Sequence, residues 1–234
     1  MAKTLELPII DFASSDRNST AKSIRQACID CGFFYLVNHG VEDKLLQKVL
    51  EGIGVALVGR LLGTMVPFVH RFDVTVSGVL DLLADFSPLT KIAGDSKESF
   101  YIGPLEDIGH LNQWPSEEVL PSWRSTMEDY YKRVLNAGER LISLIALALN
   151  LDENFFNDVG AFNLPNAFLR LLHYPGELGS CSEEIYGASA HSDYGMITLL
   201  ATDGIGGLQE RLLTWSFRLM FLPFDDPTKV QCIN

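Results

Sequence analysis

The sequence predicts an α+β fold, mainly β in its second half, in which N-terminal helices brace a β-sandwich or barrel. Two observations carry this prediction. Apolar residues recur at helical spacing before about residue 160, and short apolar strands separated by Gly, Pro, Ser and Asp follow it. Helices that precede a run of strands are typical of this class, whereas alternating βαβ units are typical of a parallel sheet.

The N-terminal part of the fold is predicted from three segments. Residues 7–12 (LPIIDF) indicate a short edge strand, residues 18–31 have helical spacing, and residues 33–37 (FFYLV) indicate a second strand that ends at an Asn-His-Gly turn. His39 in this turn has a side chain that can ligate a metal, but no second ligand lies near it in sequence. We therefore interpret His39 as a turn residue that is bonded to the backbone.

The strongest helix prediction covers residues 126–149. Ser125 and Glu128 have the spacing of a capping box, which favours a helix start at this point. Apolar residues then recur every three or four positions, which predicts a buried stripe on a core helix. Asp152 is expected to cap a short following helix that runs through Val159.

The strands of the second half are predicted at residues 167–174, 195–201 and 206–210, and we expect them to pair antiparallel. Residues 51–93 differ from their surroundings. They are rich in Gly, Val and Leu but follow neither a period of 2 nor a period of 3.6, so we assign no element to them.

Composition and charge narrow the classes of partner. The 234 residues are 47% hydrophobic and 21% charged, as in an ordinary folded protein. The formal net charge of −12 argues against nucleic acid or an anionic membrane as a partner. The first residues lack the pattern of a secretory signal, and the apolar stretch 52–69 carries Arg60 at its centre. We therefore expect a cytoplasmic protein without a transmembrane helix.

Cys28 and Cys31 form a C-x-x-C motif, which is found in redox sites and in zinc sites. A zinc site needs a second pair of ligands at suitable spacing, and the sequence offers none. We interpret both residues as small core residues between a helix and a strand, with a zinc-binding module as the minor alternative.

The most informative tripeptide for chemistry is His191-Ser192-Asp193. On a strand, residues two apart project from the same face, so this imidazole and this carboxylate can bind one cation from one side. A third ligand would complete a facial triad of two histidines and one carboxylate, which leaves open positions for a cosubstrate and dioxygen. H-x-D alone is common by chance, and a surface histidine beside an aspartate is its usual explanation.

The context of this tripeptide gives it weight. It follows the strand LRLLHYP and precedes an apolar strand and a Gly-Gly-Leu-Gln segment. Residues 7–12, 27–41 (ACIDCGFFYLVNHGV), 94–103 (GDSKESFYIG) and 111–115 (LNQWP) add further motifs in a fixed order. Together they resemble the plant-type 2-oxoglutarate/Fe(II)-dependent dioxygenases related to isopenicillin N synthase.

This resemblance covers residues 5–50 and 94–210. It implies a double-stranded β-helix, or jelly roll, with Fe(II) bound by His191 and Asp193 and with 2-oxoglutarate as cosubstrate. The implied activity is that of an oxidoreductase that uses O2 to hydroxylate or otherwise oxidise a small organic molecule, with succinate and CO2 as coproducts. Neither the substrate nor the oligomeric state is predicted.

Further residues acquire roles from the same resemblance. Tyr174 corresponds to the family tyrosine that hydrogen-bonds 2-oxoglutarate. Leu172 stands where the family often has asparagine. Phe100 and Tyr101 fall where family members line the substrate pocket, although a pair of aromatic residues is also common in a core.

The sequence departs from the family pattern in two ways. The family's distal histidine and its Arg-x-Ser follow the H-x-D pair by more than the 41 residues that separate Asp193 from Asn234. Residues 51–93 and 211–234 also lack the family's motifs. We therefore expect a truncated or alternatively spliced member, and a catalytically inactive isoform or pseudoenzyme is the alternative function.

The expected organisation follows from these boundaries. Residues 1–120 form an N-terminal dioxygenase module in which residues 51–93 are atypical. Residues 121–210 form a partial jelly-roll domain, which the N-terminal helices brace. Residues 211–234 form a tail outside the family.

Overall fold

The structure is a computed structural model that describes most of the N-terminal and central parts of the chain and shorter stretches beyond them. The described residues are 7–30, 32–58, 68–75, 98–105, 112, 114–162, 166–174, 196–203, 209–211, 219–220 and 231–233.

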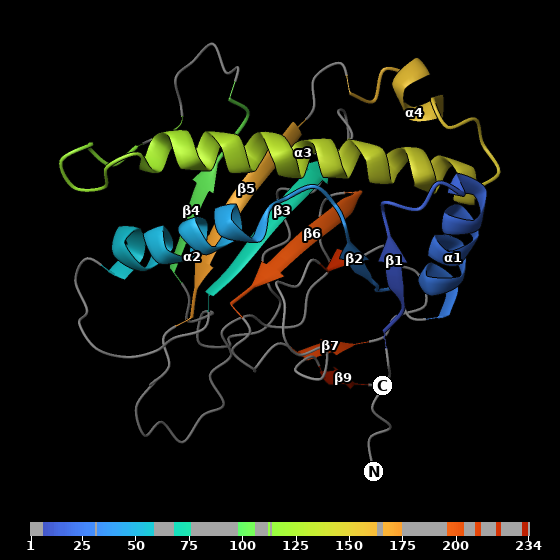
Figure 1. Ribbon diagram of the computed structural model, residues 1–234, viewed down its shortest axis with the longest axis horizontal. Helices are drawn as coiled ribbons and strands as arrows, with labels where there is room; N and C mark the ends of the chain where they lie inside the picture. The colour runs from blue at the N-terminus through green and yellow to red at the C-terminus, as the bar shows by residue number, and fades with distance from the viewer. Residues whose placement is uncertain are drawn as a thin grey trace, which may run out of the picture.

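The described residues form helices and strands in the order shown in Figure 1. The helices are α1 (Arg17–Asp30), α2 (Asp43–Val58), α3 (Trp123–Ala148) and α4 (Phe155–Asp158). The strands are β1 (Ile9–Asp11), β2 (Tyr35–Val37), β3 (Phe68–Thr75), β4 (Glu98–Ile102), β5 (Asn166–His173), β6 (Ile197–Thr202), β7 (Gln209–Arg211), β8 (Leu219–Met220) and β9 (Gln231–Ile233). This mixed content confirms the predicted α+β class.

Seven of the described strands form one sheet in the order β1-β2-β8-β6-β3-β5-β4, and β7 pairs with β9 in a second sheet. Strand β3 is antiparallel to both of its neighbours, β5 and β6. Strands β5 and β6 therefore run in the same direction on either side of β3. Strand β1 lies at one edge of the sheet, as predicted for residues 7–12.

The expectation of antiparallel pairing is only partly right. Strand β4 pairs antiparallel with β5, but β1 with β2, β2 with β8, β6 with β8 and β7 with β9 are parallel pairs. Alternation of apolar residues predicts a strand and its buried face but not its direction. Strand β3 lies within residues 51–93 and β8 within residues 211–234, and neither strand was predicted.

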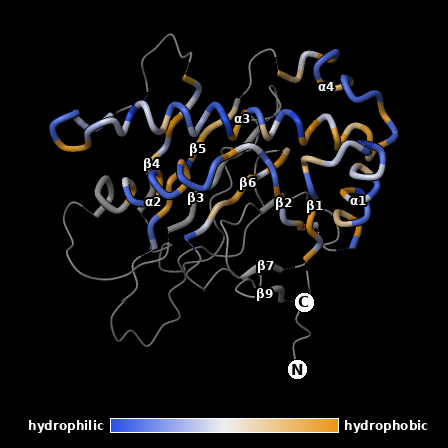
Figure 2. The backbone as a smooth tube through the Cα atoms, viewed as in Figure 1, coloured by the Kyte–Doolittle hydropathy of each residue, from blue (hydrophilic) through white to orange (hydrophobic). Residues whose placement is uncertain are grey.

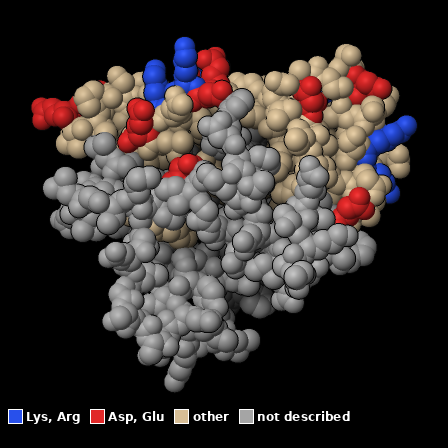
Figure 3. All heavy atoms as spheres, turned by 60° about the horizontal axis from the view of Figure 1, so that its bottom comes forward, with Lys and Arg blue, Asp and Glu red and all other residues tan. Residues whose placement is uncertain are grey.

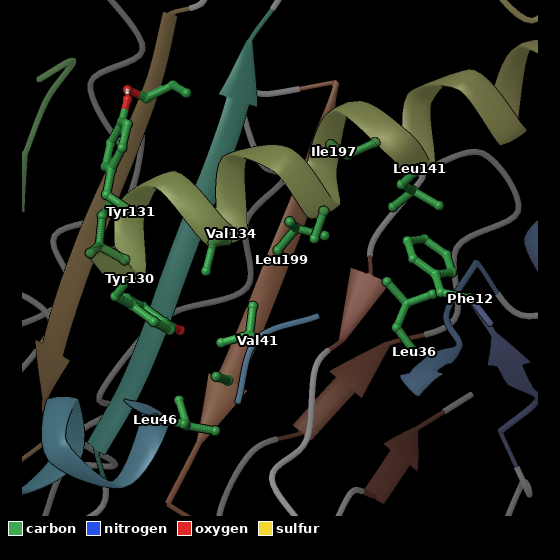
Figure 4. Packing of buried hydrophobic residues seen from close by; sticks show 14 of the residues in the cluster. Phe12, Leu36, Val41, Leu46, Tyr130, Tyr131, Val134, Leu141, Ile197 and Leu199 are labelled. Carbon is green, nitrogen blue, oxygen red and sulfur yellow. Dashed lines mark hydrogen bonds between the residues drawn. The ribbon is translucent and has the colours of Figure 1, made fainter. Parts of the chain in front are cut away.

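Helix α3 crosses one face of the sheet, in front of β4, β5, β3 and β6 in Figure 1. Its buried positions recur every three or four residues, and Figure 2 shows hydrophilic and hydrophobic residues alternating along it. Val134 and Leu141 belong to the same core cluster as Ile197 and Leu199 of β6 (Figure 4). The sequence-predicted stripe is thus confirmed as the face that covers the sheet.

The predicted start of α3 is wrong by three residues. The helix begins at Trp123, and Ser125 lies inside its first turn, where its hydroxyl donates to the Ser122 carbonyl oxygen at 3.0 Å. Glu128 accepts a hydrogen bond from Arg124 at 2.8 Å instead of closing a capping box. At the other end Asn150 has a positive φ of 61°, a conformation that commonly ends a helix.

The other helix predictions are confirmed in position. Helix α1 begins after Asp16, whose carboxylate accepts the backbone N–H of Ser19 at 2.9 Å, as an N-cap residue does. The short helix after Asp152 is present as α4, but its N-cap is Asn154 and it ends at Asp158. The Asp152 carboxylate accepts the backbone N–H of Asn154. Helix α2 was not predicted, because its second half lies in the segment without a clear period.

The first two strands join α3 through polar contacts. The side-chain amide of Asn38 and the backbone N–H of Ala13 donate to the Asp11 carboxylate, and these bonds lower the pKa of that carboxyl. Arg140 of α3 donates to the backbone oxygens of Phe12 and His39, and its guanidinium lies 5.2 Å from the centre of the Phe12 ring. These contacts fix the ends of β1 and β2 against the helix.

No helix among the described residues is long and apolar enough to cross a membrane.

Helix α2 packs so closely on α3 at Gly52 that a Cβ atom there would overlap the ring of Trp123. We expect Gly52→Ala to lower the free energy of unfolding by about 1–3 kcal/mol, the usual cost of overpacking a core. Helix propensity alone predicts the opposite sign, because Ala is favoured over Gly by about 1 kcal/mol in a helix. Urea unfolding of the two proteins measures the difference.

A double-mutant cycle provides the control for this substitution. In a Trp123→Leu background the ring is absent, so Gly52→Ala should cost less than it does in the original chain. A higher urea midpoint for the single Gly52→Ala variant would show that the two helices are not in this close contact.

A second prediction concerns His39 and pH. Its Nδ1 accepts the backbone N–H of Val41 at 3.2 Å, which confirms the interpretation of a backbone-bonded turn residue. Partial burial lowers its pKa from 6.5; the nearby Arg140 lowers it further, and Asp43 opposes the shift. The unfolded chain therefore binds more protons than the folded chain once the pH falls below about 6.5, so stability decreases with falling pH.

The variant His39→Asn keeps a side-chain acceptor for Val41 but does not titrate. We expect the stability of the original chain to fall more steeply than that of the variant between about pH 7.5 and 5.5, measured as urea midpoints. Comparison of the two proteins removes the contribution of other groups, such as Glu139, whose pKa is raised by burial. Parallel pH profiles would contradict the assignment to His39.

Candidate functional site

Alternate residues of β5 lie on opposite faces of the sheet. Ala167, Leu169 and Leu171 belong to the core cluster beneath α3, and the hydroxyl of Tyr131 on α3 donates to the Ala167 backbone oxygen at 2.7 Å. Phe168 is absent from that cluster and contacts Tyr101 of β4 instead. Successive side chains of a strand point to opposite faces, so the even-numbered residues of β5 face away from α3.

Arg170 is the charged residue of this second face. Its register partner on β4 is Tyr101, and its guanidinium carbon lies 4.9 Å from the centre of the Tyr101 ring. The Tyr101 and Phe168 rings are 5.9 Å apart at 44°. The Nε atom of Arg170 is buried and has no hydrogen-bond partner in the part of the chain that the structure describes.

The two aromatic residues that the resemblance places in a substrate pocket lie on opposite faces. Phe100 packs against the core beneath α3, as the alternative of a core residue predicted. Tyr101 is 50% exposed and lies on the face of Arg170. Leu172, where the family often has asparagine, is buried at 5% exposure.

Strand β6 continues the same face across β3. Arg71 of β3 is the register partner of both Arg170 on β5 and Leu200 on β6, so the latter two lie level with each other. Leu200 is buried but does not belong to the core cluster beneath α3. Thr198 and Thr202 have the same parity as Leu200 and are also buried.

Of the three predicted site residues, Tyr174 lies among the described residues. Tyr174 follows β5 directly and is partly buried. His191 and Asp193 lie outside the described residues. Strand β6 begins at Ile197, four residues after Asp193 in sequence, and Ile197 lies level with Ala167 at the start of β5. Tyr174 is seven residues beyond Ala167, so the start of β6 and Tyr174 are separated by roughly 23 Å along the strands.

The described histidines do not form a metal site. His173 is 4% exposed and has the parity of Leu171, so it lies on the face of α3. His39 bonds the backbone of its own turn. No group of three His, Cys, Asp or Glu side chains that could hold a metal occurs within the described ranges. Cys28 is partly buried against the core, as predicted, and Cys31 lies outside the described residues.

On the face of the molecule that Figure 3 shows, acidic and basic side chains of the described residues are interspersed. Along α3 they form exposed pairs, Arg124 with Glu128 at 2.8 Å and Arg133 with Asp129 at 3.1 Å. Exposed pairs of this kind add little stability, because water and salt screen the two charges. They are compatible with a solvated helix face and do not form a site.

Arg170 was missed by the sequence analysis. Within AFLRLLHY it is the one charged residue of an otherwise apolar strand, and it has the same parity as Tyr174. That combination is a usable signal, because a half-buried strand places residues of equal parity on one face.

Comparisons with known proteins identify relatives of this chain. The family model described as "non-haem dioxygenase in morphine synthesis N-terminal" matches residues 7–54. The 2-oxoglutarate-dependent dioxygenase citB of Monascus ruber is 31% identical over 226 residues, which cover 87% of this chain and 67% of that protein. Azadirone synthase LFS of Melia azedarach is 29% identical over 225 residues, which cover 87% of this chain and 63% of that protein.

A solved structure is also similar. A full-length Neurospora crassa protein, solved in complex with alpha-KG, superimposes with a TM-score of 0.58 and 27% identity, covering 81% of this chain and 61% of that chain. The chain thus spans less than two thirds of the length of the Neurospora protein and of the azadirone synthase. By sequence and by fold, the chain belongs to the 2-oxoglutarate-dependent dioxygenase family.

Proposed function

We propose that the protein binds Fe(II) and 2-oxoglutarate and oxidises a small organic molecule with O2. The observation that carries this proposal is the family membership, which extends over 87% of the chain in the citB comparison. The printed descriptions of the relatives support the reaction class. The Neurospora crassa protein has been solved with alpha-KG and thymine, and citB is called a 2-oxoglutarate-dependent dioxygenase.

His191 and Asp193 are the proposed ligands of the metal. One imidazole and one carboxylate two residues apart match the donor set of Fe(II) sites in which three positions stay open for cosubstrate and dioxygen. Iron and 2-oxoglutarate together would supply the oxidising chemistry, while the protein orients the substrate and excludes water. The family's distal histidine and Arg-x-Ser have no counterpart within residues 1–234, so the strength of this site is the quantity to measure.

Tyr174 is proposed to donate its hydroxyl hydrogen bond to 2-oxoglutarate. Because the start of β6 is roughly 23 Å from Tyr174 along the strands, this proposal requires the chain from Asp193 to Ile197 to run toward the end of β5. It follows β5, whose even-numbered residues face away from α3. On the other face, Leu169 and Leu171 of β5 pack in one core cluster with the buried side chains of α3. The proposed pocket therefore lies on the face that carries Tyr101 and Arg170.

The jelly roll belongs to the same proposal. The sheet that contains β6, β3 and β5 would form one wall of it, and α3 would cover that wall from outside. The proposed division into residues 1–120, 121–210 and 211–234 follows the family motifs. Strand β3 pairs with both β5 and β6, so residues of the atypical segment take part in the same sheet.

An anaerobic titration tests the metal site. Addition of Fe(II) and 2-oxoglutarate to the purified chain should give a visible charge-transfer band that saturates. We expect His191→Ala and Asp193→Ala each to weaken metal binding by about tenfold or more, because each removes one of few protein ligands. His39→Asn is the matched control, since that histidine bonds its own turn and should leave the band unchanged.

The outcomes are distinct. A band that is lost in both alanine variants and kept in the control supports the assignment. Absence of a band in the original chain, or a band that persists in both alanine variants, refutes His191 and Asp193 as ligands in this chain. Release of succinate in air would then separate binding from turnover.

A further inference from the structure

Arg170 differs from the arginines of the helices in the nature of its partners. Arg124 and Arg133 pair with carboxylates on the surface, and Arg140 donates to two backbone oxygens. Arg17 pairs with a carboxylate, that of Glu153. Within the described residues, the Arg170 guanidinium contacts the face of Tyr101, and its Nε has no acceptor.

A buried donor without an acceptor is costly. Folding removes the water that the N–H bonds in the unfolded chain, and nothing described replaces it. Stacking on an aromatic ring stabilises the charge but uses only the flat face of the guanidinium. The Nε–H group therefore remains available for an acceptor that the described part of the protein does not itself provide.

The geometry of that edge selects the chemistry of the acceptor. A guanidinium presents its N–H groups as a planar fork that matches the two oxygens of a carboxylate. Tyr101 holds the plane of the fork, so less conformational freedom is lost on binding than for a mobile side chain. An uncharged carbonyl would satisfy one donor but would leave the charge unpaired.

The surroundings of Arg170 describe the rest of the ligand. Tyr101 and Phe168 provide aromatic surface on one side, and Leu172 follows two residues along the strand. Leu200 lies level with Arg170 across β3 and is buried outside the α3 core. A ligand with an apolar or aromatic body and a carboxylate would complement these groups.

We propose that Arg170, held flat by Tyr101, binds the carboxylate of a ligand on the sheet face opposite α3. The identity of that ligand rests on the proposed function, since a dioxygenase site offers two sources of a carboxylate. One is the organic substrate, and the other is the second carboxylate of 2-oxoglutarate. Either carboxylate would form the same charge-assisted hydrogen bonds with the Arg170 guanidinium.

Calorimetric titration of the full chain tests the carboxylate preference. The probes are phenylacetate and phenylacetamide, which share an aromatic body and differ in charge. The original chain should prefer phenylacetate, and Arg170→Gln should weaken phenylacetate binding by about tenfold to a hundredfold, the range for hydrogen bonds to a charged group. Binding of phenylacetamide should stay the same.

Arg124→Gln is the matched control. Arg124 also stacks on an aromatic ring, that of Trp114 at 5.5 Å, but it lies on the exposed helix surface and pairs with Glu128. Its substitution should leave both probes unaffected. Tyr101→Leu provides a second variant at a half-exposed position, and we expect it to reduce the preference for phenylacetate because the fork loses its support.

A second pair of probes separates the two sources. 2-Oxoglutarate and 2-oxobutyrate share the keto acid group, and only the former has a second carboxylate. If Arg170→Gln abolishes the preference for 2-oxoglutarate, the residue binds the cosubstrate. If the variant keeps this preference but loses that for phenylacetate, the residue binds the substrate. Equal behaviour of Arg170→Gln and the original chain with all four probes overturns the proposal.

The calorimetric test of Arg170 and the metal titration can fail separately. Loss of phenylacetate binding in Arg170→Gln, in a chain that gives no charge-transfer band, would support the carboxylate site and refute the proposed metal site of His191 and Asp193 in this chain. A normal band in a chain without any carboxylate preference would do the reverse. Urea midpoints of the Arg170→Gln and Arg124→Gln variants verify that both remain folded.

Discussion

The packing of α3 on the sheet is the contact on which the rest of the arrangement depends. It buries Leu169 and Leu171 of β5 together with Ile197 and Leu199 of β6, all at 2% exposure or less. Because a strand alternates its side chains, this burial commits Arg170 to the opposite face. A shift of one residue in register would move the whole set to the other side of the sheet. The core contact thus places Arg170, and with it the proposed carboxylate site, on the face opposite α3.

The N-terminal motifs LPIIDF and VNHG are also explained by contacts with α3. Asp11 and Asn38 join the ends of β1 and β2, and Arg140 of α3 donates to backbone oxygens beside them. The residues of LPIIDF and VNHG are therefore those that attach two short strands to the long helix. Strands of three residues provide few ladder hydrogen bonds, so such side-chain contacts are needed to hold them in place.

Hydrophobic periodicity predicted the elements that have one buried face and one more exposed face. Helices α1 and α3 and strand β1 each have one buried face against the core, and their apolar residues repeat accordingly. Strand β6 is buried at every position, and it was predicted from its short apolar run between turn residues. Helix α2 and strand β3 were missed because residues 51–93 are apolar at most positions, which removes the contrast that a period needs. The start of α3 was misplaced because Ser125 and Glu128 have capping-box spacing, yet Ser125 bonds inside the first turn. The metal ligands were proposed through family motifs, whereas Arg170 needed the register with Tyr101 to be noticed.

In the proposed site, the residues of β5 that pack in the core alternate with those that would contact a ligand. Leu169 and Leu171 contact the core, so their size is constrained by close packing. Phe168 and Arg170 contact Tyr101 on the edge strand, which is half exposed, so substitutions there meet fewer steric limits. A strand of this design can change the chemistry of what it binds while it keeps the residues that hold α3. A buried charge costs free energy unless a partner offsets its desolvation. The single arginine in the apolar run of β5 is therefore consistent with a role in binding a partner.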